Sequence, residues 1–364
     1  MRFPEFDGEW EKVTLGKTCN VLMCKRILAS QTNAESGVPF YKIGTIGGVP
    51  DAYISKELFD MYKAKYNYPK KGEVMITCAG TVGKTMIFDG NDAYYQDSNI
   101  VWIDNPTNNI DNSFLYHYLS QIDWSKLNTT TIVRIYNDDL RQLKISYPST
   151  EEQKKISHLL NLVNQRIATQ IKIIEKLESL IKGLCQTLFV NTKYDHFVQL
   201  GNIAQISNGN SDVKDASIVN NGEMYPFFDR SDEIKYLPEY LFNKEAIIYP
   251  GEGAEFYPRY YNGKFALHQR CYAIYDISSD FIPRYLYHYC KVQNAYFVRN
   301  AVGSTVASLR LDTFKRLRVP AIPIHTQESL VKLMDKIESK LECNKSLLKK
   351  YEEQKKYLLS NLFI

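Results

Sequence analysis

The chain has 364 residues, of which 44% are hydrophobic and 24% charged, which excludes a disordered or fibrous protein. Its 45 Lys and Arg against 41 Asp and Glu leave a formal charge of +4, too small for a histone-like nucleic-acid coat. At roughly 100–200 residues per domain, this length predicts two or three domains.

In chain order, the first 150 residues predict short strands with one or two short helices, and the same plan returns over 191–325. The predicted strands are β-branched or aromatic runs bounded by Gly, Asn and Asp. They lie at 72–80, 84–90, 98–104, 245–253 and 270–276. Proline-marked breaks at Pro148 and at Pro320 and Pro323 precede two long helices, predicted over 151–190 and 326–364.

The chain repeats itself once. LYHYL at 115–119 returns as LYHYC at 286–290, and the helix segment 174–189 aligns with 348–363. The motif order is kept while the offset drifts, which indicates a duplicated unit with loop insertions and not a solenoid.

Each long helix carries ten core positions spaced alternately by four and three residues, the spacing of a heptad repeat. In the first helix they are Ile156, Leu160, Val163, Ile167, Gln170, Ile174, Leu177, Ile181, Leu184 and Leu188. In the second they are Leu330, Met334, Ile337, Leu341, Asn344, Leu348, Tyr351, Lys355, Leu358 and Leu362. Gln170 and Asn344 fall at the same step, typical of a polar residue that fixes register. Two amphipathic helices on separate cores fit so long a pattern less well.

Helices of 33 residues span roughly 50 Å, longer than the domain between them is wide. Antiparallel pairing therefore needs only a short link, whereas parallel pairing would return the chain along the whole coil. The predicted fold is α+β: two similar mixed α/β globular domains separated by a two-helix antiparallel coiled coil, a pseudo-two-fold tandem duplication.

Two segments have the composition of a nucleic-acid contact. Residues 61–71 hold four Lys and three Tyr, and residues 256–275 hold two Arg, one Lys, one His and seven aromatic residues, both without a carboxylate. Lys and Arg neutralise phosphates, while Tyr, Gln and Arg also reach base edges. A tyrosine-rich core with solvated lysines explains much of this content, but the feature occurs in both copies. Successive major grooves on one face of B-DNA lie about 34–36 Å apart, which suits two spaced modules.

Enzyme motifs are weak. Gly83-Lys84-Thr85 lacks the earlier glycine of a P-loop, because position 78 is Cys, and strands on both sides favour a hairpin turn. Asp104-Asn105-Pro106-Thr107 lacks the second proline and the aromatic residue of an adenine methyltransferase motif, so a turn is expected. His117 and His288 hold equivalent places in the repeat and are expected to be packing residues. No catalytic residues and no cofactor are predicted.

The cysteines and histidines indicate neither disulfides nor metal. Seven Cys contain no C-x-x-C pair, and six His show no paired metal spacing. The first residues lack a basic, apolar leader, and no apolar stretch reaches the length of a membrane span. A cytoplasmic protein without membrane contact is expected.

Several motifs together resemble the specificity subunit of type I restriction–modification systems. In copy one they are Gly8-Glu9-Trp10, VTLGK at 13–17, GTVGKT at 80–85, TEEQKKI at 150–156 and QTLF at 186–189. Copy two supplies VQLGN at 198–202, VGSTVASL at 302–309, HTQESLV at 325–331 and SNLF at 360–363. Copy two departs in having Gln327-Glu328 for Glu152-Gln153. It also has GEGAEFY where copy one has AGTVGKT.

The resemblance implies a non-catalytic subunit with target-recognition domains at 1–150 and 191–325 that each read one half of a split DNA sequence. It implies that the helices space the domains and dock two methyltransferase subunits, joined by two restriction subunits where a nuclease exists. The residues expected to touch double-stranded DNA are basic, amide or hydroxyl side chains in acid-poor loops. They are Lys70, Lys71, Thr81, Lys84, Tyr95, Gln96 and Arg134 in copy one, and Arg230, Arg259, Tyr260, Lys264, His268, Gln269 and Arg310 in copy two.

Two alternatives from other classes stay open. One is a stand-alone DNA-binding regulator, which would bind a promoter without a methyltransferase partner. The other is a self-sufficient methyltransferase or NTPase with degenerate motifs, which would bind S-adenosylmethionine or ATP by itself.

Overall fold

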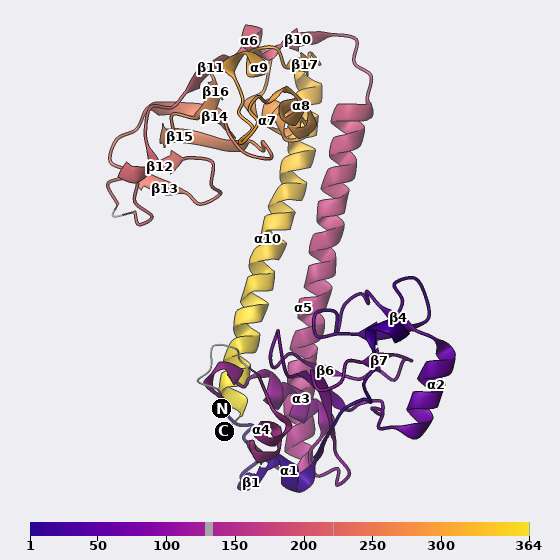
Figure 1. The fold of residues 1–364 in the computed structure, drawn as a ribbon. Helices are drawn as coiled ribbons and strands as arrows, with labels where there is room; N and C mark the ends of the chain where they lie inside the picture. Colours follow the sequence, from indigo (N-terminus) through magenta and orange to yellow (C-terminus); the bar gives the residue numbers. More distant parts are fainter. Residues whose placement is uncertain (128–133, 221, 364) are drawn as a thin grey trace. The chain divides into compact units, whose positions relative to one another are not determined.

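The computed structural model describes residues 1–127, 134–220 and 222–363. The chain divides into two compact units: unit 1 comprises residues 1–170 and 347–364, and unit 2 comprises residues 171–346. Each unit combines a mixed α/β domain with one segment from each of two long helices (Figure 1). Among the described residues, no helix is both long and apolar enough to cross a membrane.

Unit 1 is built on two small sheets and a separate two-stranded ladder. The sheets have the strand orders β2-β8-β5-β6 and β4-β3-β7, and β1 pairs with β9. Its strands are β1 (Glu11–Thr14), β2 (Asn20–Leu22), β3 (Val38–Tyr41), β4 (Tyr53–Ile54), β5 (Val74–Thr77), β6 (Thr85–Ile87), β7 (Tyr94–Tyr95), β8 (Ile100–Asp104) and β9 (Lys144–Tyr147). Its short helices are α1 (Leu15–Thr18), η1 (Ala29–Gln31), α2 (Lys56–Lys65), α3 (Asn112–Ser120), η2 (Trp124–Leu127) and α4 (Asn137–Gln142).

Unit 2 repeats this plan with longer strands. A six-stranded sheet has the order β11-β16-β14-β15-β12-β13, and β10 pairs with β17. The strands are β10 (Phe197–Gln199), β11 (Gln205–Asn208), β12 (Tyr225–Phe228), β13 (Lys235–Leu237), β14 (Phe242–Pro250), β15 (Arg259–Leu267), β16 (Cys271–Tyr275) and β17 (Arg318–Pro320). The short helices are α6 (Leu200–Ile203), η4 (Val213–Asp215), α7 (Pro283–Lys291), α8 (Asn294–Asn300) and α9 (Leu311–Lys315).

The two sheets of unit 1 correspond to the single sheet of unit 2. Residues 259–265 of β15 pair with β14 as β6 pairs with β5, and its last two residues run parallel to β12 as β7 runs parallel to β3. In unit 1 the strand is interrupted between Ile87 and Tyr94, where Gly90 has a φ of 91° that favours glycine. The strand pairings of the two copies therefore confirm the predicted duplication, and the antiparallel β5–β6 hairpin around Gly83 is confirmed as well.

The long helices are α5 (Thr150–Cys185), continued by a π-helical turn (Gln186–Asn191), and α10 (Ile324–Leu362). All twenty predicted core positions are buried or half-buried. Within unit 1, Ile156 and Leu160 of α5 share a core cluster with Leu358 and Leu362 of α10. The early part of α5 therefore packs on the late part of α10.

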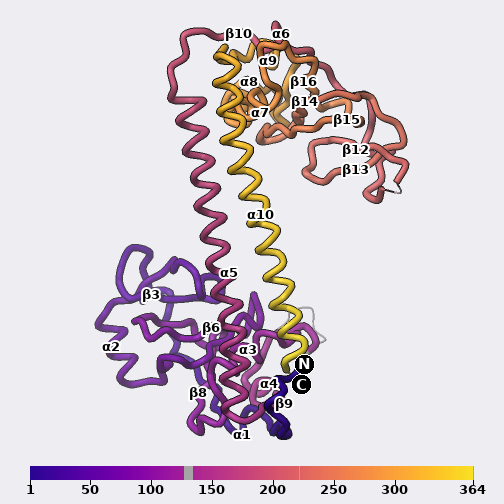
Figure 2. The backbone as a smooth tube through the Cα atoms, turned by 180° about the vertical axis from the view of Figure 1, so that it is seen from behind, coloured from indigo at the N-terminus to yellow at the C-terminus, as the bar shows by residue number. Residues whose placement is uncertain are grey.

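Unit 2 shows the reverse half of the same pairing. The late part of α5, from Ile181 to Leu188, shares a core cluster with Leu330 and Met334 of α10. Glu178 lies 3.2 Å from Lys345 further along the pair. The segments of α5 and α10 thus run antiparallel within each unit, as the views from both sides show (Figures 1 and 2).

One buried glutamine joins each long helix to its domain. The Gln153 amide donates to the carbonyls of Asn109 and Pro148 and accepts from the Asp111 N–H. Gln327 makes the same three bonds, to the carbonyls of Asp280 and Ile322 and from the Ile282 N–H. Gln327 of copy two therefore corresponds to Gln153 of copy one. The Glu that differs between the copies lies beside this shared glutamine and does not replace it.

Candidate nucleic-acid interface

Each unit has a cleft at the carboxyl end of its parallel strand pair. In unit 1 the Gln96 N–H donates to the Tyr41 carbonyl over 2.9 Å, and in unit 2 the His268 N–H donates to the Phe228 carbonyl over 2.9 Å. Gln96 and His268 thus occupy equivalent positions, and each lines its cleft. We call the cavity of about 350 Å³ in unit 1 cleft 1 and the cavity of about 490 Å³ in unit 2 cleft 2.

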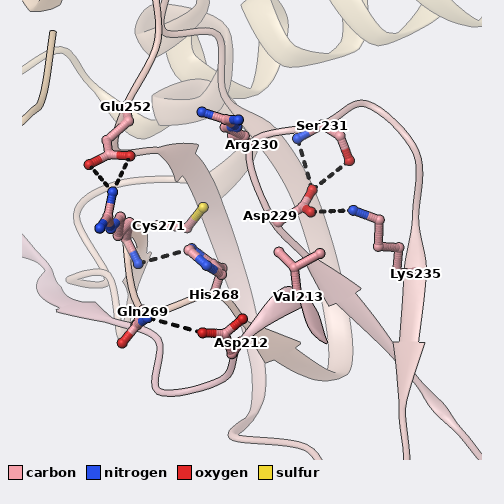
Figure 3. Close-up of a pocket in the computed structure, with 11 residues that line it drawn as sticks. Asp212, Val213, Asp229, Arg230, Ser231, Lys235, Glu252, His268, Gln269 and Cys271 are labelled. Atoms are coloured by element: carbon pink, nitrogen blue, oxygen red, sulfur yellow. Dashed lines mark hydrogen bonds and ion pairs between the residues drawn. The ribbon is translucent and has the colours of Figure 1, made fainter. Parts of the chain in front are cut away.

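Cleft 2 is lined by charged side chains that largely pair with one another (Figure 3). Lys235 lies 2.5 Å from the buried Asp229, and Arg270 makes a two-pronged ion pair with Glu252 at 2.8 and 2.9 Å. Burial alone would raise the pKa of Asp229, but hydrogen bonds from Lys235 and Ser231 outweigh it and lower that pKa. Asp229 is therefore an ionised anchor that holds the cleft wall.

Three polar side chains of cleft 2 keep capacity for a ligand. Arg230 is exposed and makes no hydrogen bond or ion pair with any described residue. The His268 Nδ1 accepts the Arg270 N–H over 3.2 Å, so the neutral ring carries its proton on Nε2. The Gln269 amide is exposed, with one long contact of 3.5 Å to Asp212. A guanidinium fork, a ring N–H and an amide are the groups that read base edges.

Cleft 1 has different chemistry on the same backbone. The Gln96 Oε1 is buried and has no hydrogen-bond partner within the described chain. Lys42 pairs with Asp51 at 2.9 Å, and Arg26 lies 3.5 Å from Asp97. An unsatisfied buried acceptor is costly unless a ligand completes it, and an adenine amino group is a donor that glutamine commonly meets in the major groove.

The structure brings together only some of the predicted DNA contacts. Arg230, His268 and Gln269 line cleft 2, and Gln96 lines cleft 1. The remaining exposed or half-exposed ones lie outside the clefts: Lys70, Lys71, Thr81, Lys84, Arg134, Lys264 and Arg310. Thr81 and Lys84 lie on the β5–β6 hairpin, where the Lys84 Nζ donates to the Ile46 carbonyl over 2.6 Å.

Three residues predicted to contact DNA instead pack against or hydrogen-bond to residues of their own unit. Tyr95 is only 3% exposed and stacks on Tyr41 in the core, so its ring does not reach the surface. The Arg259 guanidinium donates to the Asp229 and Ser231 carbonyls and lies over the Phe228 ring. Tyr260 donates to Glu245 and lies under the Arg284 guanidinium. The interface proposed below does not include them.

Sequence reasoning missed Arg270, Arg26 and Lys42 as cleft residues. Arg270 lies in the acid-poor run 256–275, so composition could have found it. Arg26 and Lys42 come from separate loops, after β2 and after β3, that meet only in the folded unit, and no local pattern marks them.

The two repeat histidines are buried in polar networks, which confirms their predicted packing role. His117 of α3 lies 2.9 Å from Asn161 of α5, and His288 of α7 lies 2.8 Å from Asp335 of α10. His288, Asp335 and Glu338 lie close enough to hold a metal ion. Arg284 and Lys291 already neutralise these carboxylates, as expected of a structural ion network and not of a metal centre.

Comparison with known proteins identifies the family. A family model described as the type I restriction modification DNA specificity domain matches residues 7–179 and again residues 193–353. The chain belongs to this family. The two matches confirm the resemblance and the duplicated layout inferred from the sequence.

Members of this specificity family with known sequence or structure resemble the chain to different extents. A protein of Haemophilus influenzae, named as a type I restriction enzyme specificity subunit, is 46% identical over 176 residues. That match covers 48% of the chain and 42% of the relative, so the chain spans less than half the length of the curated relative it matches.

Two solved structures share the fold over nearly the whole chain. The S subunit of a type I restriction–modification system from M. genitalium has a TM-score of 0.70 at 17% identity, covering 100% of this chain and 99% of its own. A structure that describes complex assembly and conformational transition of the type I restriction–modification system has a TM-score of 0.56 at 15% identity, and the match covers 98% of both chains. The predicted fold class is thereby confirmed.

Proposed function

We propose that the chain is the non-catalytic DNA-recognition subunit of a type I restriction–modification enzyme. The carrying observation is the pair of equivalent clefts with different linings on a duplicated scaffold. A repeated backbone presents Gln96 in one unit and His268, Arg230 and Gln269 in the other. Two such readers suit a target in two parts, with residues 1–150 and 191–325 each reading one half.

Within this proposal the cleft residues read bases and the outer cations hold the backbone. The donors and acceptors for base edges come from Gln96, Arg230, His268 and Gln269. Arg270 supplies a second guanidinium when it is released from its ion pair with Glu252. Lys70, Lys71, Thr81, Lys84, Arg134, Lys264 and Arg310 contact phosphates, which fix register without reading sequence.

The proposed partners are two adenine methyltransferase subunits, and two restriction subunits where a nuclease is present. The two long helices, predicted at 151–190 and 326–364 and formed by α5 and α10, are proposed as their docking surface, and the cytoplasm is proposed as the location. The chain needs no cofactor of its own for this role, because the methyl transfer belongs to the partners.

The test is methylation mapping by single-molecule sequencing in cells that carry the system with a variant of this chain. Gln96→Ala should relax one position in one half-site, and Arg230→Ala one position in the other, each by about 1–3 kcal/mol of discrimination. Arg299→Ala is the matched control, because Arg299 is exposed on α8 outside the clefts.

Loss of discrimination in the same half-site for both cleft variants would refute the assignment of one unit to each half. Purification of the chain without any methyltransferase, combined with tight binding to one promoter, would favour a stand-alone regulator. Binding of S-adenosylmethionine by the purified chain would favour a self-sufficient enzyme.

A further inference from the structure

Unit 1 contains a small basic pocket that the proposed interface does not use. The pocket has a volume of about 310 Å³ and is formed on the two-stranded β1–β9 ladder, with Lys17 of α1 and Tyr118 of α3 completing its wall. Lys12, Lys144 and Ser146 line it from the ladder itself.

Strand register explains why these side chains converge. Lys12 is paired with Ser146 and Thr14 with Lys144, and side chains two apart along a strand share one face. Val13 and Ile145, which also line the pocket, alternate with these residues along the strands and pack against the core of unit 1. The ladder is thus apolar on one face and carries two ammonium groups and two hydroxyls on the other.

The pocket has positive charge without a matching carboxylate. No Asp or Glu is among its lining residues, and Lys12, Lys17 and Lys144 form no ion pair within residues 1–127, 134–220 and 222–363. Ser146 is only 8% exposed, and its Oγ is buried without a hydrogen-bond partner among the described atoms. A buried hydroxyl beside three cations needs an acceptor, and an anion supplies it.

Lysines on an exposed ladder also guard against edge-to-edge association, but that role does not account for the unpartnered Ser146 hydroxyl. The second copy keeps the ladder but changes most of these side chains. Phe197, Asn202 and Pro320 replace Lys12, Lys17 and Ser146, and the Arg318 guanidinium lies 4.8 Å from the centre of the Phe197 ring. Lys12, Lys17 and Ser146 are therefore specific to copy one and not a requirement of the repeated fold.

We propose that this pocket binds a phosphate group. Lysine ammonium groups bind phosphate as point charges, and a phosphate at neutral pH carries about −1 to −2 charges with several strong acceptor oxygens. Lys12, Lys17 and Lys144 neutralise the anion, while the Ser146 hydroxyl donates a hydrogen bond to one of its oxygens. The phosphate comes either from a DNA backbone or from a free phosphate compound.

The test uses the full chain and titrates inorganic phosphate by isothermal calorimetry. Ser146→Ala should lower phosphate affinity about tenfold, the loss of one charge-assisted hydrogen bond. Because this hydroxyl has no partner in the protein, the melting temperature should stay the same or rise. Lys12→Gln should also weaken binding, whereas Lys154→Gln, which changes an exposed lysine on α5, should not.

A second, independent measurement distinguishes the two sources of the phosphate. If the source is a DNA backbone, Lys12→Gln should reduce the slope of log affinity against log salt for duplex DNA by about one. An unchanged slope, together with weakened inorganic phosphate binding, assigns the site to a free phosphate compound. Equal phosphate affinity in wild type, Ser146→Ala and Lys12→Gln overturns the proposal, even if the chain binds DNA as proposed above.

Discussion

The buried glutamine in the first turn of each long helix is expected to be a major anchor of its unit. Gln153 is fully buried and satisfies three backbone groups, with bond lengths of 3.0, 2.9 and 2.7 Å. Gln153→Ala leaves two carbonyls and one N–H without partners. Each costs about 1–3 kcal/mol when buried, so we expect a loss of about 3–5 kcal/mol, allowing for partial access of water.

The tryptophans make this loss measurable in one unit. All three, Trp10, Trp102 and Trp124, belong to unit 1, so their fluorescence in urea reports the unfolding of that unit. With a slope of about 2 kcal/mol per molar urea, Gln153→Ala should lower the midpoint by about 2 M. Gln165→Ala, an exposed position on the same helix, is the control and should leave the midpoint almost unchanged.

The equivalent change in copy two provides an internal check. Gln327→Ala should speed amide exchange of Ile282, whose N–H it frees, as measured by mass spectrometry of peptides that cover 279–283. A fluorescence midpoint for Gln153→Ala within a few tenths molar of the control would refute the reasoning, since it would mean that the three bonds contribute little.

Three further predictions concern the hairpin and the acid stability of each unit. Gly83→Ala should destabilise unit 1 by more than about 2 kcal/mol, because Gly83 has a φ of 81° and a Cβ would lie 1.9 Å from Trp124; Gly44→Ala, with open space around it, is the control for the same fluorescence assay. Burial lowers the pKa of His117, so the unfolded chain takes up the proton first, and unit 1 should lose stability as pH falls below about 6.5. Burial alone would raise the pKa of Glu338, but hydrogen bonds from His288 and Lys291 bring it to about 2, so its contribution in unit 2 is present above the unfolded value and is lost between about pH 4.5 and 2. Tryptophan fluorescence in urea at pH 7 and pH 5.5 checks the prediction for His117, and amide exchange of α7 between pH 5 and 3 checks the prediction for Glu338; an acid response of unit 2 that precedes that of unit 1 would contradict both.

The repeat and the heptads could be predicted because both are properties of sequence order. Twenty core positions were placed by spacing alone, and all of them are buried or half-buried. The β5–β6 hairpin was predictable as well, since strand-like runs flank Gly83 closely on both sides. Local patterns were sufficient wherever the structural partner is near in sequence or repeats at a fixed period.

The cleft linings could be predicted only in part, because residue type does not reveal burial. Tyr95 and Gln96 are neighbours in one polar loop of the sequence, yet Tyr95 stacks in the core while Gln96 faces the cleft. Arg259 is a basic residue in an acid-poor run, as expected of a DNA contact, but its guanidinium donates hydrogen bonds to the Asp229 and Ser231 carbonyls. Such assignments depend on long-range strand pairing, which composition does not encode.

Comparison of the two copies distinguishes the residues that keep the same bonds in both from the residues that differ. Gln153 and Gln327 keep the same three bonds, and His117 and His288 keep the same place on the helix that faces the long helix. Around the second histidine, Arg284 and Asp335 replace Ser113 and Asn161, so a neutral network became a charged one without changing the packing. At these positions the two charges occur together, as expected because a single unmatched charge there would lack a partner. At the cleft position that Gln96 and His268 share, the side chains differ in chemistry while the backbone N–H keeps the same hydrogen bond, so this position can vary without loss of the scaffold.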